Sequence, residues 1–211
     1  MRAPARSPHS PARAVAPDAA AFARGTGTRN RATGAPPPMH VVLFGAGHVG
    51  HALVTLLGAL PCTVQWVDTR DELFPDECPP NVQPEPTDTP EAIVDAAPPG
   101  TYFLVMTHNH ALDFALAEQI MRRRDFAYFG MIGSRTKRVK FERRLAARGV
   151  DPARLVEMVC PIGVAGIVDK EPGSIAVAVC AELLQVRAGM PVAGAKAAAA
   201  AATRDDACCL R

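Results

Sequence analysis

The sequence predicts an α/β protein with a Rossmann-like, doubly wound fold, in which a mainly parallel sheet carries helices on both faces. Three observations lead to this prediction. Short apolar runs alternate with amphipathic helical segments along most of the chain. A glycine-rich turn joins the first apolar run to the first helix. Polar residues gather directly after several runs, where the strands of a parallel sheet would end.

The predicted strands are short apolar runs bounded by Gly, Pro or polar residues. They cover residues 40–44, 63–67, 101–106 and 126–132. A Pro-rich stretch at 75–90 is too polar for a core, and within it only a short strand near Val82 is expected.

The predicted helices have apolar residues at helical spacing and begin or end near Pro or Gly. In the first, apolar residues from Val49 to Leu60 share one face and Pro61 ends the helix. Strands that alternate with helices predict right-handed crossovers. The helices cover residues 49–60, 90–97, 111–124, 136–148 and 171–186.

The glycine-rich turn reads GAGHVG and matches the GxGxxG pattern between a strand and a helix. Gly45 permits the tight turn, Gly47 lets the backbone approach a phosphate, and Gly50 lets the helix pack against the strand. The free N–H groups and the dipole of the helix start favour an anion, so the turn predicts a nucleotide or pterin-phosphate site. The alternative is a purely structural glycine turn. The predicted contacts are Gly45, Gly47, His48, Val49 and Gly50.

Asp68 ends the second predicted strand, 18 residues after Gly50. A carboxylate at this position would hold a ribose hydroxyl of a nucleotide. Because Thr69 and Arg70 follow, Asp68 could instead cap a turn. Both Asp68 and Arg70 are candidate ligand contacts.

Three further segments should meet at the carboxyl edge of the sheet. The first contains Thr107, His108 and Asn109, with Asp113 one turn into the next helix. The histidines of this segment could act as acid or base groups, but no third ligand lies nearby, so no metal site is predicted. Asn109 could equally be the helix N-cap.

The second segment carries Gly133, Ser134, Arg135 and Lys137 at the start of a basic helix. Helix N–H groups beside two cations would form a second anion site. The alternative is a solvated basic helix face, with Ser134 as its N-cap. The third segment contains Pro161 and Gly163, and its glycines permit a backbone to approach a ligand or simply shape a buried loop.

The composition and charge of the chain argue against several classes of protein. The net charge of +2 gives no general affinity for nucleic acid or membranes, and no apolar run is long enough to span a bilayer. None of the six cysteines forms a CxxC pair, and a reducing cytoplasm is the expected compartment.

Both ends of the chain are expected to lie outside the folded domain. Residues 1–38 hold six Arg against one acid and are expected to form a disordered Ala/Pro/Arg-rich tail. Residues 188–211 are expected to form a flexible Ala-rich tail. The domain is therefore expected at 39–187.

Taken together, these motifs resemble the Rossmann domain of the XdhC/CoxI family of molybdenum-cofactor accessory proteins. The resemblance covers about 150 residues and five blocks in the same order. The blocks are GAGHVG at 45–50, VDTR at 67–70 with Phe74-Pro75, Thr107-His108 with Asp113, YFGMIGSRTK at 128–137, and Pro161-Ile162-Gly163 with Lys170-Glu171-Pro172.

The resemblance implies a non-catalytic chaperone of purine catabolism, which binds the molybdenum cofactor (molybdopterin) and delivers it to xanthine dehydrogenase. The implied partner is the molybdenum subunit of that enzyme, with a cysteine desulfurase and a second copy of the chain as further candidates. Family members usually carry a separate N-terminal domain, and here 38 low-complexity residues stand in its place. The alternative is an NAD(P)-dependent oxidoreductase or a nucleotide-binding module.

Overall fold

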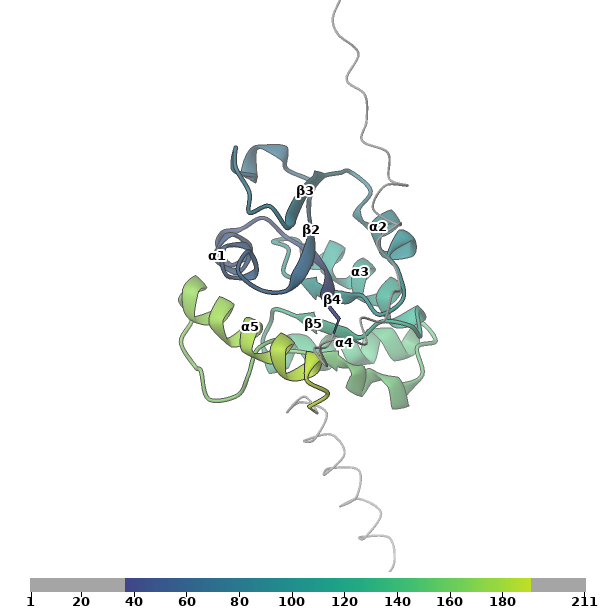
Figure 1. The fold of residues 1–211 in the computed structure, drawn as a ribbon. Helices are drawn as coiled ribbons and strands as arrows, with labels where there is room; N and C mark the ends of the chain where they lie inside the picture. Colours follow the sequence, from purple (N-terminus) through teal and green to yellow (C-terminus); the bar gives the residue numbers. More distant parts are fainter. Residues whose placement is uncertain (1–36, 191–211) are drawn as a thin grey trace, which may run out of the picture.

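The computed structural model describes residues 37–190, and its centre is a six-stranded parallel sheet with the order β3-β2-β1-β4-β5-β6 (Figure 1). The order reverses between β1 and β4, which defines the switch point of a doubly wound sheet. The strands are β1 Met39–Phe44, β2 Cys62–Asp68, β3 Val82–Pro86, β4 Tyr102–Val105, β5 Tyr128–Met131 and β6 Met158–Val159.

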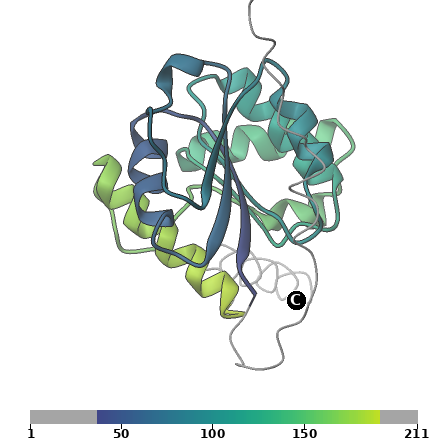
Figure 2. The ribbon, with the colours of Figure 1, turned by 45° about the horizontal axis from the view of Figure 1, so that its top comes forward.

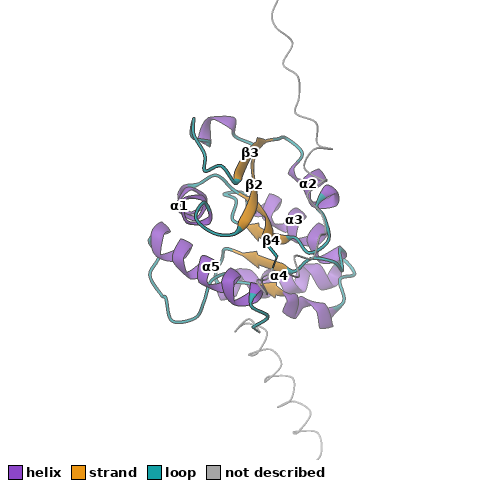
Figure 3. Cartoon of the chain, in the orientation of Figure 1, coloured by secondary structure: helices purple, strands orange, loops and turns teal. Residues whose placement is uncertain are grey.

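Helices cover both faces of the sheet (Figures 2 and 3). The α-helices are α1 His48–Leu57, α2 Pro90–Ala96, α3 His110–Arg122, α4 Arg135–Ala147 and α5 Pro172–Arg187. Two short 3₁₀ helices, η2 Asp71–Leu73 and η3 Pro152–Glu157, lie in the connections. The predicted fold class is confirmed.

Two apolar cores lie on opposite faces because successive side chains of a buried strand point in opposite directions. On β1, Val41 and Leu43 face the core beneath α1 and α5, whereas Val42 and Phe44 face the core beneath α2, α3 and α4. The sheet is therefore covered on both sides, as an all-parallel sheet requires.

The sequence placed all five helices and five of the six strands to within a few residues. The short strand expected near Val82 is confirmed as β3. The two-residue strand β6 and both 3₁₀ helices were not predicted. Residues 188–190, assigned to the tail, instead complete the end of α5, because the Ala188 N–H donates to the Leu184 carbonyl. Of the predicted tails at 1–38 and 188–211, residues 1–36 and 191–211 lie outside the described residues.

The connections that leave β1, β2, β4, β5 and β6 emerge at one edge, since all six strands run parallel. This carboxyl edge holds all the site residues predicted from the sequence. The opposite, amino edge is marked by the contact between the end of α5 and the chain before β1, where Arg187 Nε donates to the Pro37 carbonyl.

Candidate functional site

The three glycines of the 45–50 turn have three different environments. Gly45 has a φ of +119°, and a Cβ there would lie 2.4 Å from the Met106 carbonyl oxygen. A Cβ on Gly50 would lie 2.2 Å from the Gly45 carbonyl oxygen. A Cβ on Gly47 would meet nothing within 4 Å. Gly45 and Gly50 are therefore required by packing, whereas Gly47 borders open space where a ligand could approach.

Gly47 is also the N-cap of α1, and no side chain caps this helix start. The first helical bond runs from the His51 N–H to the Gly47 carbonyl, so the N–H groups of His48, Val49 and Gly50 precede the helical ladder. His48 is exposed and Val49 packs against the core beneath α1. The arrangement suits a phosphate, which can accept bonds from such N–H groups.

Trp66 supports the turn from below. Its buried indole Nε1–H donates to the Gly45 carbonyl over 3.1 Å, and its ring packs edge-on against His51 and Phe74. His51 is fixed in turn by a 2.8 Å hydrogen bond between Nε2 and the Leu73 carbonyl. The carbonyl that Gly50 approaches is therefore held in place by an aromatic cluster.

Asp68 lies directly beside the turn, and both its carboxylate oxygens are engaged within the protein. Oδ2 accepts from the Ala46 N–H at 2.7 Å and from Arg70 Nη2 at 3.0 Å, while Oδ1 accepts from the Arg70 N–H and Nε at 3.1 and 2.9 Å. Burial raises the pKa of Asp68, but the bonds from Arg70 and Ala46 outweigh it and hold the pKa below 3.8. The turn-capping alternative is what the structure shows, with Arg70 as a charge partner.

Thr107, Asp113 and Lys137 form a second network between β4 and β5. Asp113 is fully buried, and its Oδ1 accepts from the Thr107 N–H at 3.2 Å and the Thr107 hydroxyl at 2.7 Å. Its Oδ2 lies 2.6 Å from Lys137 Nζ, which also donates to the Ile132 carbonyl at 2.9 Å. Three residues that the sequence predicts as ligand contacts, Thr107, Asp113 and Lys137, thus lie together, but their side chains bond to one another.

The loop after β4 presents His108 at the surface and uses Asn109 internally. Asn109 Oδ1 accepts from the N–H groups of Ala111 and Leu112, which confirms the N-cap alternative for α3. His108 lines a small hollow of about 10 Å³ between the ends of β1, β2 and β4. That volume has room for about one water molecule. The lining residues are Phe44, Val67, Asp68, Thr69, Pro90, Thr107, His108 and Leu112.

At the start of α4, Ser134 is the N-cap and its Oγ accepts from the Lys137 N–H at 3.2 Å. A Cβ on Gly133 would lie 2.6 Å from Lys137 Cδ and 3.1 Å from Cys160 Sγ, so this glycine makes room for those side chains. Burial raises the pKa of the Cys160 thiol to about 11. Of the predicted second anion site, Arg135 is the exposed cation, while Lys137 already has a carboxylate partner.

The loop after β6 is fixed by a buried carboxylate on α5. Gly163, with a φ of +105°, donates its N–H to Glu182 Oε2 at 2.7 Å, and the Tyr128 hydroxyl donates to the same oxygen at 2.5 Å. Burial and the nearby Glu182 raise the pKa of Tyr128 well above 10.0. Pro161 is exposed beside this loop. The glycine is explained by this loop structure, and ligand contact here stays a prediction.

A larger open hollow of about 670 Å³ lies beside η2 and the edge strand β3. Three of its lining side chains are the carboxylates Asp71, Glu72 and Asp76, so it suits an anion poorly. Within residues 37–190, no cluster of three or more His, Cys, Asp or Glu could hold a metal ion. No helix in this same range is long and apolar enough to cross a membrane.

Comparison with protein families adds a decisive observation. A family model described as the XdhC Rossmann domain matches residues 41–183, which include all six strands of the sheet except the first residues of β1. The chain belongs to the XdhC Rossmann-domain family. The resemblance inferred from the five sequence blocks is confirmed.

Three similar proteins differ in length from this XdhC Rossmann domain, and two of them are much longer. Escherichia coli YqeB is 31% identical over 157 residues, covering 72% of this chain and 28% of YqeB. A Bacillus halodurans crystal structure described as a xanthine dehydrogenase has a TM-score of 0.61 and 23% identity, covering 74% of this chain and 44% of that one. A Lactococcus lactis structure described as the oxidoreductase ylbE, at 14% identity, has a TM-score of 0.43 and covers 70% of this chain and 86% of that one. The chain thus spans less than half of the first two of these proteins.

Two residues of the XdhC domain escaped the sequence analysis although each leaves a signal. Glu182 is the only acid within the apolar helix from Pro172 to Arg187, which indicates a buried and paired carboxylate. Trp66 is the only Trp of the chain and lies two residues before Asp68 in a buried strand. An indole in such a strand needs an acceptor, and the carbonyl of the neighbouring glycine turn supplies it.

Proposed function

We propose that this XdhC-family domain binds the phosphorylated pterin of the molybdenum cofactor and serves as an accessory protein that hands it to xanthine dehydrogenase. The cofactor is cargo here, and the domain itself catalyses no redox step. In this proposal the receiving partner is the molybdenum subunit of the enzyme. A cysteine desulfurase is a second candidate partner.

The observation that carries the proposal is the open cradle at Gly47 in a chain of the XdhC family. The turn offers N–H groups at the start of α1, no side chain caps them, and a missing Cβ leaves the approach free. These features fit the phosphate of a pterin ligand. Thr107, His108 and Arg135 lie along the same edge and are the side chains we propose to meet the rest of the ligand.

The state of Asp68 weighs against the alternative of an NAD-dependent oxidoreductase. In dinucleotide-binding domains the carboxylate at the end of the second strand accepts the ribose hydroxyls. Here four N–H groups from Ala46 and Arg70 already occupy both oxygens.

Two measurements on the full chain test the proposal. The first identifies the ligand and the molybdenum content of freshly purified protein by mass spectrometry and elemental analysis. The second measures activation of cofactor-free xanthine dehydrogenase by the loaded protein. We expect a pterin phosphate in the protein and activation that depends on it.

A Gly47→Val variant is the matched control, because the added side chain enters open space in the protein but blocks the phosphate. It should fold and yet neither retain the pterin nor activate the enzyme. Tight binding of NAD(H) with reproducible turnover of a small alcohol, aldehyde or hydroxy acid, and no activation, would overturn the proposal.

A further inference from the structure

The edge strand β3 turns hydrogen-bond acceptors outward but no donors. The Thr87 N–H donates to the Asp68 carbonyl on β2 at 3.0 Å. Because alternate residues of a strand bond to the same neighbour, Val82, Pro84 and Pro86 turn their backbone groups away from β2. The two prolines have no N–H, and the Val82 N–H already donates to a carbonyl of the preceding loop. Within residues 37–190 no strand pairs with this outer side, so the edge presents carbonyl oxygens alone.

Three carboxylates without ion-pair partners lie beside this edge. Asp71, Glu72 and Asp76 line the open hollow of about 670 Å³ between η2 and β3. Among the described residues, no Lys or Arg side chain forms an ion pair or a hydrogen bond with any of the three. The neighbouring Arg70 gives its side-chain hydrogen bonds to Asp68 instead. The hollow therefore carries several negative charges.

The hollow suits arginine better than a metal ion. No group of three or more His, Cys, Asp or Glu in the described part of the chain is arranged to hold a metal. A guanidinium has five N–H donors and no acceptor, which matches an edge of carbonyls and carboxylates. Its planar face also packs against aromatic and apolar side chains. The hollow supplies such walls with Phe74, Pro75, Pro84 and Pro86.

A segment of this chain has the complementary composition. Residues 71–91 hold seven acids and no Lys or Arg. Residues 2–13, which lie outside the described residues, hold three Arg and no acid, whereas residues 14–23 hold one acid and no Lys or Arg. Residues 2–13 also contain three prolines, and proline-rich segments bind apolar, aromatic-lined grooves without forming a β ladder. Both the charge and the prolines of residues 2–13 thus fit the hollow.

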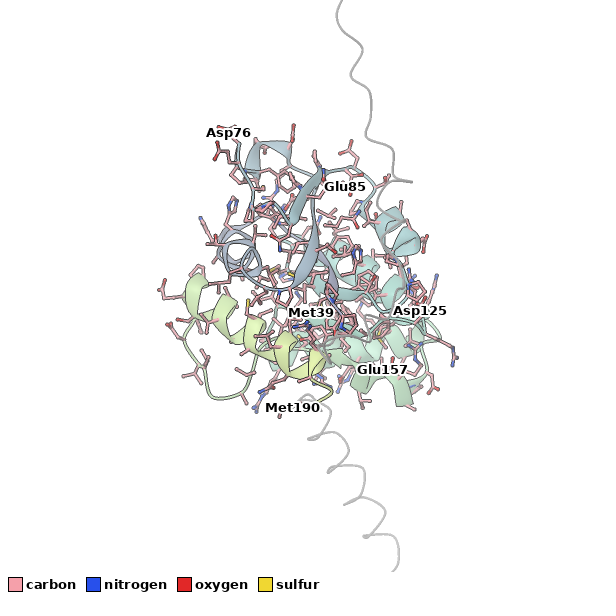
Figure 4. The ribbon with its side chains drawn as sticks, viewed as in Figure 1. Met39, Asp76, Glu85, Asp125, Glu157 and Met190 are labelled. Carbon is pink, nitrogen blue, oxygen red and sulfur yellow. The ribbon has the colours of Figure 1, made fainter. Side chains whose placement is uncertain are left out.

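The hollow lies some way from the start of β1. The strand registers place Pro84 level with Leu43, and β3 lies two strands from β1. Because Pro37 precedes Leu43 by six residues, the hollow lies about 20 Å along the strands and about 10 Å across them from Pro37. Figure 4 shows Asp76 at the outer end of this path and Met39 near its beginning.

Residues 2–13 have enough chain to cover this distance. Arg13 precedes Pro37 by 24 residues, which extend to at most about 80 Å and can follow the surface of the domain. Arg29 and Arg31 precede Pro37 by eight and six residues, which extend to at most about 30 Å and leave little length for the route around the sheet. The distance therefore favours residues 2–13 over the arginines nearer the domain.

We propose that residues 2–13 of this chain dock in the hollow beside β3, where their arginine side chains bond to its carboxylates and to the outward carbonyls of the strand. The docked segment covers the free edge of the sheet, which is otherwise a template for pairing with another chain. Gly47 does not line the hollow, so docking is independent of the proposed ligand site.

Limited trypsin digestion of the full chain tests the docking, because trypsin must take the arginine side chain into its own pocket. An Asp71→Asn/Glu72→Gln/Asp76→Asn variant, which we call the hollow variant, removes the three carboxylates. Its initial cleavage rates after Arg6 and Arg13 should exceed those of the parent at least about 10-fold, since a protease cuts the undocked population.

Two comparisons show whether this change is specific. Cleavage after Arg29 should differ less than about 2-fold between the parent and the hollow variant. The matched control is Asp88→Asn/Glu91→Gln/Asp95→Asn, which removes three acids that do not line the hollow and should be cut like the parent. Circular dichroism verifies that each variant is folded.

A synthetic peptide of residues 2–15 tests the same hollow from outside the chain. It should bind the full-length Arg6→Gln/Arg13→Gln variant at least about 10-fold more tightly than the parent, whose own segment competes at a high effective concentration. The matched control is Arg29→Gln/Arg31→Gln, which should bind the peptide as weakly as the parent does. Binding should weaken in 1 M salt, where the Debye length falls to about 3 Å.

Three results overturn the proposal. The first is equal cleavage after Arg6 and Arg13 in the parent and the hollow variant. The second is a peptide that binds the Arg6→Gln/Arg13→Gln variant no more tightly than it binds the parent. The third is protection that rises with protein concentration, because the segment would then occupy the hollow of another copy.

Discussion

At the scale of single residues, the glycines of the turn differ in their surroundings, because Gly45 and Gly50 are crowded whereas Gly47 borders open space. Gly47 has an extended backbone with a φ of −81° and open space around it, but it is the N-cap of α1, where Val is less favourable than Gly, so Gly47→Val should cost about 1 kcal/mol or less of the free energy of unfolding. Phosphate binding should weaken at least about 100-fold, because the branched side chain fills the space that the ligand needs. Because Trp66 bonds to the Gly45 carbonyl, we expect its emission to change when a ligand binds the turn, and this change measures the affinity.

Gly50→Ala is the contrasting variant, since its Cβ would lie 2.2 Å from a backbone oxygen. It should lower the free energy of unfolding by about 1–3 kcal/mol. If Gly47→Val destabilises the fold as much as Gly50→Ala does, or binds ligand as the parent does, the role assigned to Gly47 is wrong.

Asp68 gives the stability of the domain a pH dependence. Its pKa is below 3.8 in the folded state, so its contribution is fully present above the unfolded pKa and is lost as the pH falls through the folded value. Asp68→Asn should cost about 1–2 kcal/mol at pH 7, a modest figure because Arg70 is one-third exposed. Urea unfolding at pH 7 and pH 3 should show the difference between parent and variant shrinking in acid; a constant difference contradicts the assignment.

At the scale of elements, the Asp113–Lys137 pair fastens α3 to α4 across the ends of β4 and β5. Removing one partner leaves a buried charge uncompensated, so Asp113→Asn and Lys137→Met should each cost about 3 kcal/mol or more. The double variant should cost less than the sum of the two, with a coupling energy above about 1 kcal/mol. Denaturant unfolding of all four proteins measures this.

The same set of variants distinguishes two roles for Lys137, one in stability and one in ligand binding. A lysine that mainly contacts the ligand would lower affinity when replaced and leave stability nearly intact. If the two substitutions have additive effects on the free energy of unfolding, and only Lys137→Met weakens ligand binding, then Lys137 contacts the ligand. That result would refute its role in fastening α3 to α4.

The sequence could predict most elements because apolar runs, glycines and prolines act locally. It could not predict β6, since two residues give no periodicity, and β6 exists only through its pairing with β5. The candidate site divides in the same way. The close approach of Gly50 to the Gly45 carbonyl follows from local sequence, whereas Gly45 is also crowded by the distant Met106 carbonyl and Asp113 pairs with Lys137, 24 positions away. Polar and charged side chains can bind a ligand or can pair with buried polar groups of the protein. Only the three-dimensional structure shows which of the two a given residue does.

At the scale of the whole molecule, the candidate site residues share one edge of the sheet. The family match covers residues 41–183. Relatives such as YqeB extend well beyond the matched region, which covers 28% of YqeB. The simplest activity that this domain could perform alone is binding the cargo. Binding of the pterin phosphate is therefore the step to measure first.

Isothermal titration of the full chain with molybdopterin species, NAD(H) and NADP(H) tests that step most directly. The account predicts that a molybdopterin species binds with one site per chain, that Gly47→Val abolishes this binding while remaining folded, and that NAD(H) binds far more weakly. Preferential binding of NAD(H), or molybdopterin binding that is unchanged in Gly47→Val, would contradict it.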